Sequence, residues 1–171
     1  MIWILIIAGL GIAGLIALLL FGLAQPVKHS VMRSIVLQQK PETIFAAIDN
    51  ADDFPSWSSL VTKVERLPDR DGYAATRQTM KFGMTIITTI LERTPPTHLV
   101  VRAEKEGGPV WGTWTYRIES AGEGCRVSIT ENGEMRNPFF RALGQLRGLD
   151  ASIKTQLSDL ARKFGERAAI S

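Results

Sequence analysis

The sequence holds few residues of the kinds that build covalent or metal-dependent sites. Cys125 is its only cysteine, so no intramolecular disulfide bond can form, which agrees with a reducing compartment. Its two histidines, His29 and His98, are isolated and lie at no metal-ligand spacing from other histidine, cysteine or carboxylate residues. We therefore expect no metal site and no cofactor, two structural or solvated histidines, and a buried, unreactive Cys125.

The motifs of several common site classes are also missing. The sequence has no G-x-S-x-G nucleophile elbow and no glycine loop of the kind that cradles a phosphate. Its 20 Lys and Arg residues against 17 Asp and Glu residues give a net charge of only +3, and basic residues are not interleaved with exposed aromatics. We therefore expect no nucleic-acid partner.

One long segment, Ile2–Ala24, has no charged side chain. At a helical rise of about 1.5 Å per residue, it is long enough to cross a hydrocarbon core of roughly 30 Å. We interpret residues 1–24 as an uncleaved transmembrane anchor. A cleaved signal peptide is the alternative, because the small residues at 22–24 suit a cleavage site. Against it, no Lys or Arg precedes the run, and the run is longer than a usual signal core.

The charges that follow this segment and the small residues within it indicate its orientation and its possible contacts. Lys28, Arg33 and Lys40 all follow the span, so the positive-inside tendency predicts a single-pass protein whose soluble domain lies on the cytoplasmic side. Small residues also recur at every fourth position, and this face either admits a partner helix or simply faces lipid. These small residues are Gly9, Ala13 and Ala17.

The rest of the chain suits one domain with one core. We divide it into a linker at 25–28, the domain at 29–168 and a tail at 169–171. Alternation predicts a first strand at 29–38, and Pro41 begins a short helix that is followed by a second helical turn at 54–60. After residue 60 the pattern changes to strands separated by turn signals. The predicted strands are 61–67, 73–82, 85–94, 98–105, 111–119 and 125–135.

The last segment is helical by its periodicity. Apolar residues recur at every third or fourth position, which predicts one long amphipathic helix, bent near Gly144 or Gly148. The stripe consists of Phe140, Leu143, Leu149, Ile153, Leu157, Leu160 and Phe164. The fold class is therefore α+β, with a curved antiparallel sheet, a long C-terminal helix across its concave face, and a pocket in the space between them.

The order of these segments resembles a known superfamily. The strand VMRSIVLQQ and the helix pair KPETIFAAIDNADDFPSW are similar to the start of the SRPBCC (START and polyketide-cyclase-like) superfamily. The stretch WGTWTYRIESAGEGCRVSITENGEMRNPFF resembles its final hairpin and the entry to its C-terminal helix. The resemblance covers roughly residues 29–166 and points to the polyketide cyclase/dehydrase-related branch, in a form with an N-terminal membrane anchor.

This resemblance implies a helix-grip fold with an internal apolar cavity between the sheet and the C-terminal helix. It does not imply one function, because the members include lipid and quinone carriers, hormone receptors and cyclases. The function of this chain must therefore be argued from the residues that face the cavity.

Strand alternation places one carboxylate among those residues. Trp114 and Tyr116 share one parity in the last hairpin, and Glu131 has the matching parity on its second strand. A turn centred near Gly122 would set Trp114 opposite Glu131. Because a carboxylate in an apolar pocket needs a partner, Glu131 is either a satisfied structural group or a ligand contact.

Other candidates lie on the third strand and near the cavity mouth. Gln78 is a candidate polar contact, and Met80 and Phe82 either form an adaptable wall or pack in the core. Trp57 and Trp111 are expected to flank the mouth, where each is either a gate for an apolar ligand or a plug that holds the helix pair to the sheet.

Three functions remain open. The first is a membrane-anchored binding protein for an apolar small molecule such as a lipid, isoprenoid or quinone. The second is a cyclase or dehydratase that uses Glu131 as general acid or base, with Tyr116 as proton donor. The third is a ligand-free membrane scaffold that assembles with another membrane helix through Gly9, Ala13 and Ala17.

Overall fold

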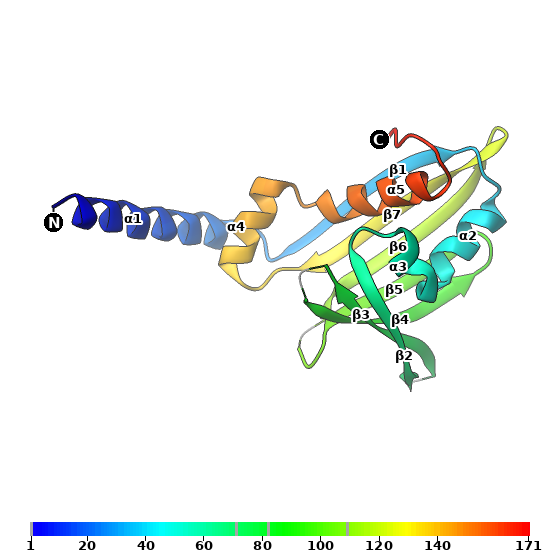
Figure 1. Cartoon of the computed structure of the whole chain (residues 1–171), viewed down its shortest axis with the longest axis horizontal. Coiled ribbons are helices and arrows are strands. Elements are labelled where there is room, and N and C mark those ends of the chain that lie inside the picture. Colours follow the sequence, from blue (N-terminus) through cyan, green and yellow to red (C-terminus); the bar gives the residue numbers. More distant parts are fainter. Residues whose placement is uncertain (1, 71, 82, 109) are drawn as a thin grey trace.

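The computed structural model describes residues 2–70, 72–81, 83–108 and 110–171. They form an N-terminal helix that projects from an α+β domain (Figure 1). In chain order the elements are α1 (Ile2–Ala24), β1 (Lys28–Leu37), α2 (Pro41–Asp49), the 3-10 helix η1 (Ala51–Asp53), α3 (Phe54–Trp57), β2 (Val61–Arg70), β3 (Tyr73–Met80), β4 (Thr85–Thr94), β5 (His98–Lys105), β6 (Val110–Ala121), β7 (Gly124–Glu134), α4 (Pro138–Arg147) and α5 (Ala151–Lys163).

The seven strands form one antiparallel sheet in the order β1-β7-β6-β5-β4-β3-β2. Strands β2 to β7 follow one another as a meander, and β1 joins the free edge of β7. The chain leaves β1 and reaches β2 at the opposite edge, so α2, η1 and α3 bridge the full width of the sheet. This is the physical reason why a helix pair follows the first strand.

The predicted strands agree with the observed ones to within a few residues. The largest difference is at β2, which continues to Arg70 because its pairing with β3 extends to the Arg70–Tyr73 pair. Smaller differences are at the end of β3, which is observed at Met80, and at the end of β6, which is observed at Ala121. Phe82, a predicted wall residue at the end of the third strand, lies outside the described residues.

The core lies between the concave face of the sheet and α5. Ile153, Leu157 and Leu160 recur at helical spacing and are at most 1% exposed. They belong to the same buried cluster as Val127 and Ile129 of β7. Removing such side chains from water contributes roughly 1.5–3 kcal/mol each, so the α5 stripe holds the helix against the sheet.

The predicted single C-terminal helix is wrong in one respect. The helix is broken into α4 and α5 at Gly148, whose φ of +88° is a left-handed conformation that glycine adopts without strain. Phe140, assigned to the core stripe, is instead 60% exposed. Only α5 lies across the sheet, while α4 packs against the C-terminal part of α1 (Figure 1).

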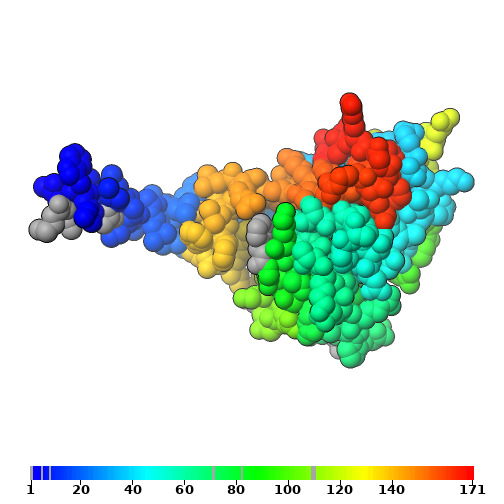
Figure 2. All heavy atoms as spheres, in the orientation of Figure 1, coloured from blue at the N-terminus to red at the C-terminus, as the bar shows by residue number. Residues whose placement is uncertain are grey.

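Within the described ranges, α1 is the one helix that is long and apolar enough to cross a membrane. Figure 2 shows that it extends away from the domain and that α4 covers only the end nearest the domain. At the other end of the chain, Ser171 exchanges two backbone hydrogen bonds of 2.9 Å with Ser34 of β1.

Candidate ligand-binding cavity

A cavity of about 520 Å³ lies between the concave face of the sheet and α5. Its wall is mainly apolar and comes from strands β2 to β7, with contributions from α2, η1, α3 and α5. Prominent wall residues are Leu67, Ile86, Ile90, Leu99 and Val101. A pocket of this size and lining is typical of a small-molecule site.

Six of the seven predicted contact residues line this cavity. They come from three strands, and their role in binding remains a prediction. They are Gln78 and Met80 of β3, Trp111, Trp114 and Tyr116 of β6, and Glu131 of β7. The register confirms that Trp114 lies opposite Glu131.

Trp57, the seventh predicted contact, is not part of the cavity wall. It is 8% exposed, packs edge-to-face on Phe54 at 5.2 Å between ring centroids, and has the ammonium of Lys163 at 5.7 Å from its ring. Its backbone carbonyl accepts a hydrogen bond from Arg162 of α5. These contacts are those of a plug between the helix pair and α5.

Glu131 is the centre of a polar cluster at one end of the cavity. Its Oε1 lies 3.4 Å from Nε2 of His29, and its Oε2 accepts a 3.0 Å hydrogen bond from Oγ of Ser152. The side chains of His29 and Glu131 are 7% and 17% exposed. A carboxylate has about four acceptor positions, so the two protein partners leave capacity for a donor group on a ligand.

The backbone explains why His29 reaches Glu131. His29 of β1 pairs with Gly133 of β7, and a Cβ at Gly133 would lie only 2.5 Å from the imidazole. Glycine therefore makes the space that the ring occupies, two residues from Glu131 on the same strand.

Sequence reasoning missed both partners of Glu131. It assigned His29 a structural or solvated role and did not consider Ser152. A signal for His29 was present, because it shares strand parity with the buried Ile35 and Leu37 and so points to the core face. No comparable signal marks Ser152. Its position in the first turn of α5 depends on the break at Gly148, where a separate helix begins.

Tyr116 lies beside this cluster. Burial raises the pKa of its phenol, and the charge of Glu131 raises the pKa further. The hydroxyl group therefore stays protonated and is suited to donating a hydrogen bond rather than to releasing a proton.

A second polar position lies on β3 and β4, separated from β7 by two strands. The Nε2 amide of Gln78 donates a 3.1 Å hydrogen bond to Oγ1 of Thr88, which is itself 2.7 Å from Oγ1 of Thr76. Hydrogen bonding to Thr88 fixes the orientation of the Gln78 amide. This amide is therefore a polar group of fixed orientation in the cavity wall. Among the described residues, no group of three or more His, Cys, Asp and Glu side chains could hold a metal ion.

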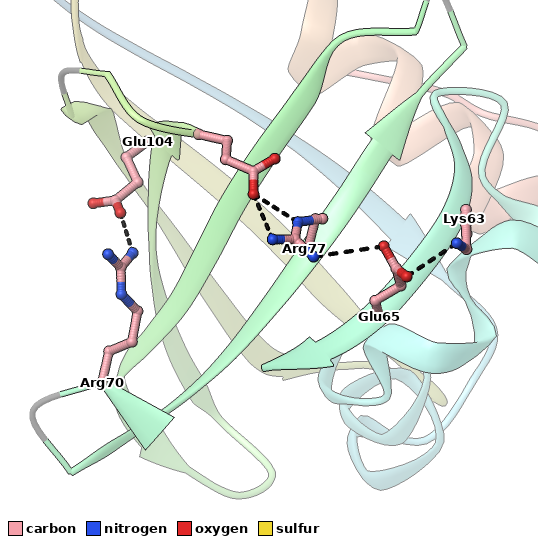
Figure 3. Close-up of polar contacts among 6 residues, drawn as sticks. Lys63, Glu65, Arg70, Arg77 and Glu104 are labelled. Atoms are coloured by element: carbon pink, nitrogen blue, oxygen red, sulfur yellow. Dashed lines mark hydrogen bonds and ion pairs between the residues drawn. The ribbon is translucent and has the colours of Figure 1, made fainter. Parts of the chain in front are cut away.

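The opposite face of the sheet carries ion pairs rather than a site. Figure 3 shows Arg77 beside Glu65 and Arg70 beside Glu104. Arg77 also pairs with Glu106. The hydrogen bond from Arg77 to Glu106 is 2.7 Å long and raises the pKa of the guanidinium. These charges are partly exposed and neutralise one another, so they make a solvated outer surface.

The fold is shared with aromatase/cyclases of known structure. The Zhui aromatase/cyclase from Streptomyces sp. R1128 is similar with a TM-score of 0.66 and 11% identity over 80% of this chain and 93% of that one. The di-domain aromatase/cyclase BexL from the BE-7585A biosynthetic pathway has the same TM-score and identity, and the match covers 86% of this chain and about half, 53%, of BexL. XoxI from Bacillus cereus has a TM-score of 0.60 and 13% identity over 81% of this chain and 96% of its own.

At these identities the structural likeness shows the fold alone. No functionally curated protein matches the sequence significantly. The family model described as polyketide cyclase / dehydrase and lipid transport matches residues 28–165, which is nearly the whole domain. The chain therefore belongs to the polyketide cyclase/dehydrase and lipid transport family.

Proposed function

We propose that this chain is a membrane-anchored protein that binds an apolar small molecule in the cavity between the sheet and α5. The observation that carries the proposal is the cavity of about 520 Å³ with its mainly apolar wall. Such a wall gains free energy by removing an apolar ligand from water, and the polar group at Glu131 would fix the ligand's orientation. A lipid, an isoprenoid or a quinone-like compound has this combination of apolar body and polar end.

The N-terminal helix supports a membrane location. Its length and composition suit a membrane span, and a bilayer concentrates the apolar compounds that such a cavity would take. The basic residues Lys28, Arg33 and Lys40 that follow α1 favour the cytoplasmic side for the domain. The face of Gly9, Ala13 and Ala17 is available to a partner helix, which would add assembly to binding.

The polar cluster also supports a second candidate, a cyclase or dehydratase. Glu131 would act as the base, since its carboxylate lines the cavity. Tyr116 is a weak choice as the acid because its pKa is raised. The contacts of Glu131 with His29 and Ser152 are hydrogen-bonding contacts that suit polar recognition, so binding remains the preferred function.

The proposal is tested by photo-crosslinking in the cell. The full chain carries a benzophenone amino acid in place of Trp114, which lines the cavity, and is irradiated before purification. We expect intact-protein mass spectrometry to show an adduct of one defined apolar mass. The control carries the same amino acid at Val100, which has the opposite parity on β5 to the wall residues Leu99 and Val101. Adducts absent at Trp114, or equal at both positions, would contradict binding in the cavity.

A further inference from the structure

Helix α4 is fixed to the end of α1 by contacts that leave little freedom between them. A Cβ at Gly22 would lie 1.9 Å from the carbonyl oxygen of Pro138, so the two helices touch through their backbones. The buried guanidinium of Arg141 donates a 2.8 Å hydrogen bond to the carbonyl of Gly22. This bond satisfies a carbonyl at the C-terminus of α1 and places a positive charge at the negative end of the helix dipole.

Arg141 also holds the segment that leads into α4. Its Nη1 donates to the carbonyls of Met135 and Arg136, at 3.1 Å and 3.0 Å. The amide of Met135 in turn donates a 2.8 Å bond to the carbonyl of Val27. The end of the span, the start of β1 and the start of α4 therefore form one connected unit.

The opposite face of α4 is apolar and uncovered. Arg141 and Ala142 are buried, whereas Phe140 and Leu146 are 60% and 66% exposed. Phe139 and Leu143 complete the same face at helical spacing and are half-buried. A helix of a water-soluble domain turns such a face to the core, so this arrangement needs an apolar surface outside the chain.

The position of α4 along α1 identifies that surface. The 23 residues of α1 extend about 34 Å, slightly more than a hydrocarbon core of roughly 30 Å. Gly22 therefore lies at the boundary between hydrocarbon and headgroups when α1 spans a bilayer, and α4 lies at the same depth. Figure 1 shows α4 crossing the end of α1 rather than continuing along it, which is the direction of a helix in the membrane plane.

The charges around α4 agree with this depth. Arg136 and Arg147 stand before and at the end of the helix and are exposed, as is Lys28. Glu134 offsets part of this charge through pairs with Lys28 and Arg136, at 3.7 Å and 3.3 Å. The remaining positive charge suits the headgroups of anionic lipids.

We propose that α4 is a membrane-interfacial helix, whose face of Phe139, Phe140, Leu143 and Leu146 lies against the lipid bilayer that α1 spans. The inference rests on the proposed membrane anchor but not on the proposed ligand. The lipid surface is its occupant because backbone contacts fix α4 to the end of α1 and basic residues stand at both ends of α4.

An interfacial α4 also affects the position of the cavity. One end of the sheet is marked by the register pairs Lys28–Glu134, Gly112–Gly133, Ala103–Gly112 and Ile86–Lys105. This is the end nearest to α1. The wall residues Met80, Met84 and Trp111 lie at it, so an interfacial α4 would hold this side of the cavity close to the membrane.

The test measures the depth of single side chains of the full chain in vesicles of phosphatidylcholine and phosphatidylglycerol. Cys125 is first replaced by alanine, and single cysteines with an environment-sensitive fluorophore are placed at Phe140 and Leu146. Because both positions are exposed, no core packing is lost. A label at Leu15, in the middle of α1, reports the span, and a label at Glu123, in the β6–β7 turn at the far end of the sheet, is the aqueous control.

We expect the fluorescence emission of labels at Phe140 and Leu146 to shift to shorter wavelength. Lipids that carry a quencher near the headgroup should quench this emission, and iodide in the aqueous phase should not. The Glu123 label should show the reverse. Labels at 140 and 146 that iodide quenches, beside a Leu15 label quenched from within the lipid, would overturn the inference and leave the anchor standing. An iodide-accessible Leu15 label would overturn the anchor and the inference together, while the crosslink at Trp114 tests the cavity separately.

Discussion

Ser152 of α5 donates a 3.0 Å hydrogen bond to Glu131 of β7, and this contact joins the helix to the sheet inside the cavity. Replacing Ser152 with alanine removes a donor from a largely buried carboxylate. We expect the free energy of unfolding, from urea titrations followed by tryptophan fluorescence, to fall by about 1 kcal/mol. The control is Ser158→Ala on the same helix, which leaves the Glu131 cluster intact. Equal losses in both variants would show that the bond adds no stability.

The imidazole of His29 occupies the space that Gly133 leaves free, with 2.5 Å between a hypothetical Cβ and its Cε1 atom. Gly133→Ala should therefore displace the ring and destabilise the domain by about 1–3 kcal/mol, as overpacking does. In a His29→Ala background the same change should cost much less. Additive losses in this double-mutant cycle would contradict the packing of the ring on Gly133.

Trp57 and Trp111, which sequence analysis treated alike, have different surroundings. Trp57→Ala removes a ring from the core and should lower the free energy of unfolding by about 3–5 kcal/mol. Trp111→Ala changes only the cavity wall, so it should cost less stability and reduce the yield of the Trp114 crosslink. To compare ligand capture without unfolding, the milder Trp57→Phe variant should keep the crosslink yield of the wild type. A lower crosslink yield in Trp57→Phe would instead indicate that Trp57 is a gate for the ligand.

Asp150 links α5 to β1 through Lys154 at 3.0 Å and Arg33 at 2.6 Å. The hydrogen bond from Lys154 and the charge of Arg33 hold the pKa of this carboxyl below its usual range. Because the folded-state pKa is depressed, the pairs stabilise the fold above pH 4 and lose their effect as the pH falls below it. We expect Asp150→Asn to cost about 1 kcal/mol at pH 7.

The pH dependence of that loss is the decisive feature. Urea titrations between pH 7 and pH 3 should show the gap between wild type and Asp150→Asn closing below about pH 4. A gap that stays constant over this range would mean that the substitution acts through packing rather than charge.

The contact between Gly22 and Pro138 predicts that a substitution at Gly22 displaces α4, whereas one elsewhere in α1 does not. Gly22→Leu should separate α4 from α1, because any Cβ there overlaps the Pro138 carbonyl. Trypsin should then cleave faster at Arg136, Arg141 and Arg147 in the vesicle-bound chain. The matched control is Gly11→Leu, since a Cβ at Gly11 meets no atom within 4 Å. Equal cleavage rates in both variants would show that the contact with Gly22 does not hold α4 in its position.

Much of the fold was predictable because local signals and tertiary packing agree. The stripe of Ile44, Phe45 and Ile48 faces the core in α2, as its spacing indicates. Trp114 lies opposite Glu131 because the turn at Gly122 and strand parity together determine the hairpin register. These features depend on residues close to one another in the sequence.

The unpredicted features depend on distant partners. Apolar residues continue at helical spacing across Gly148, from Leu146 to Leu149 and Ile153. Periodicity alone therefore cannot show that α4 leaves the core to pack on α1. The contact of His29 with Glu131 spans 102 positions in the chain and needs the β1–β7 pairing to become visible.

The central claim is that the cavity holds an apolar small molecule, and native mass spectrometry of the intact full-length chain tests it most directly. The protein is released from detergent in the gas phase, and any retained compound is extracted into organic solvent and identified. We expect one apolar compound per chain, and we expect Ala103→Trp, which fills the cavity from β5, to lose it. A wild-type chain that is consistently empty, or a compound retained equally by Ala103→Trp, would contradict the account.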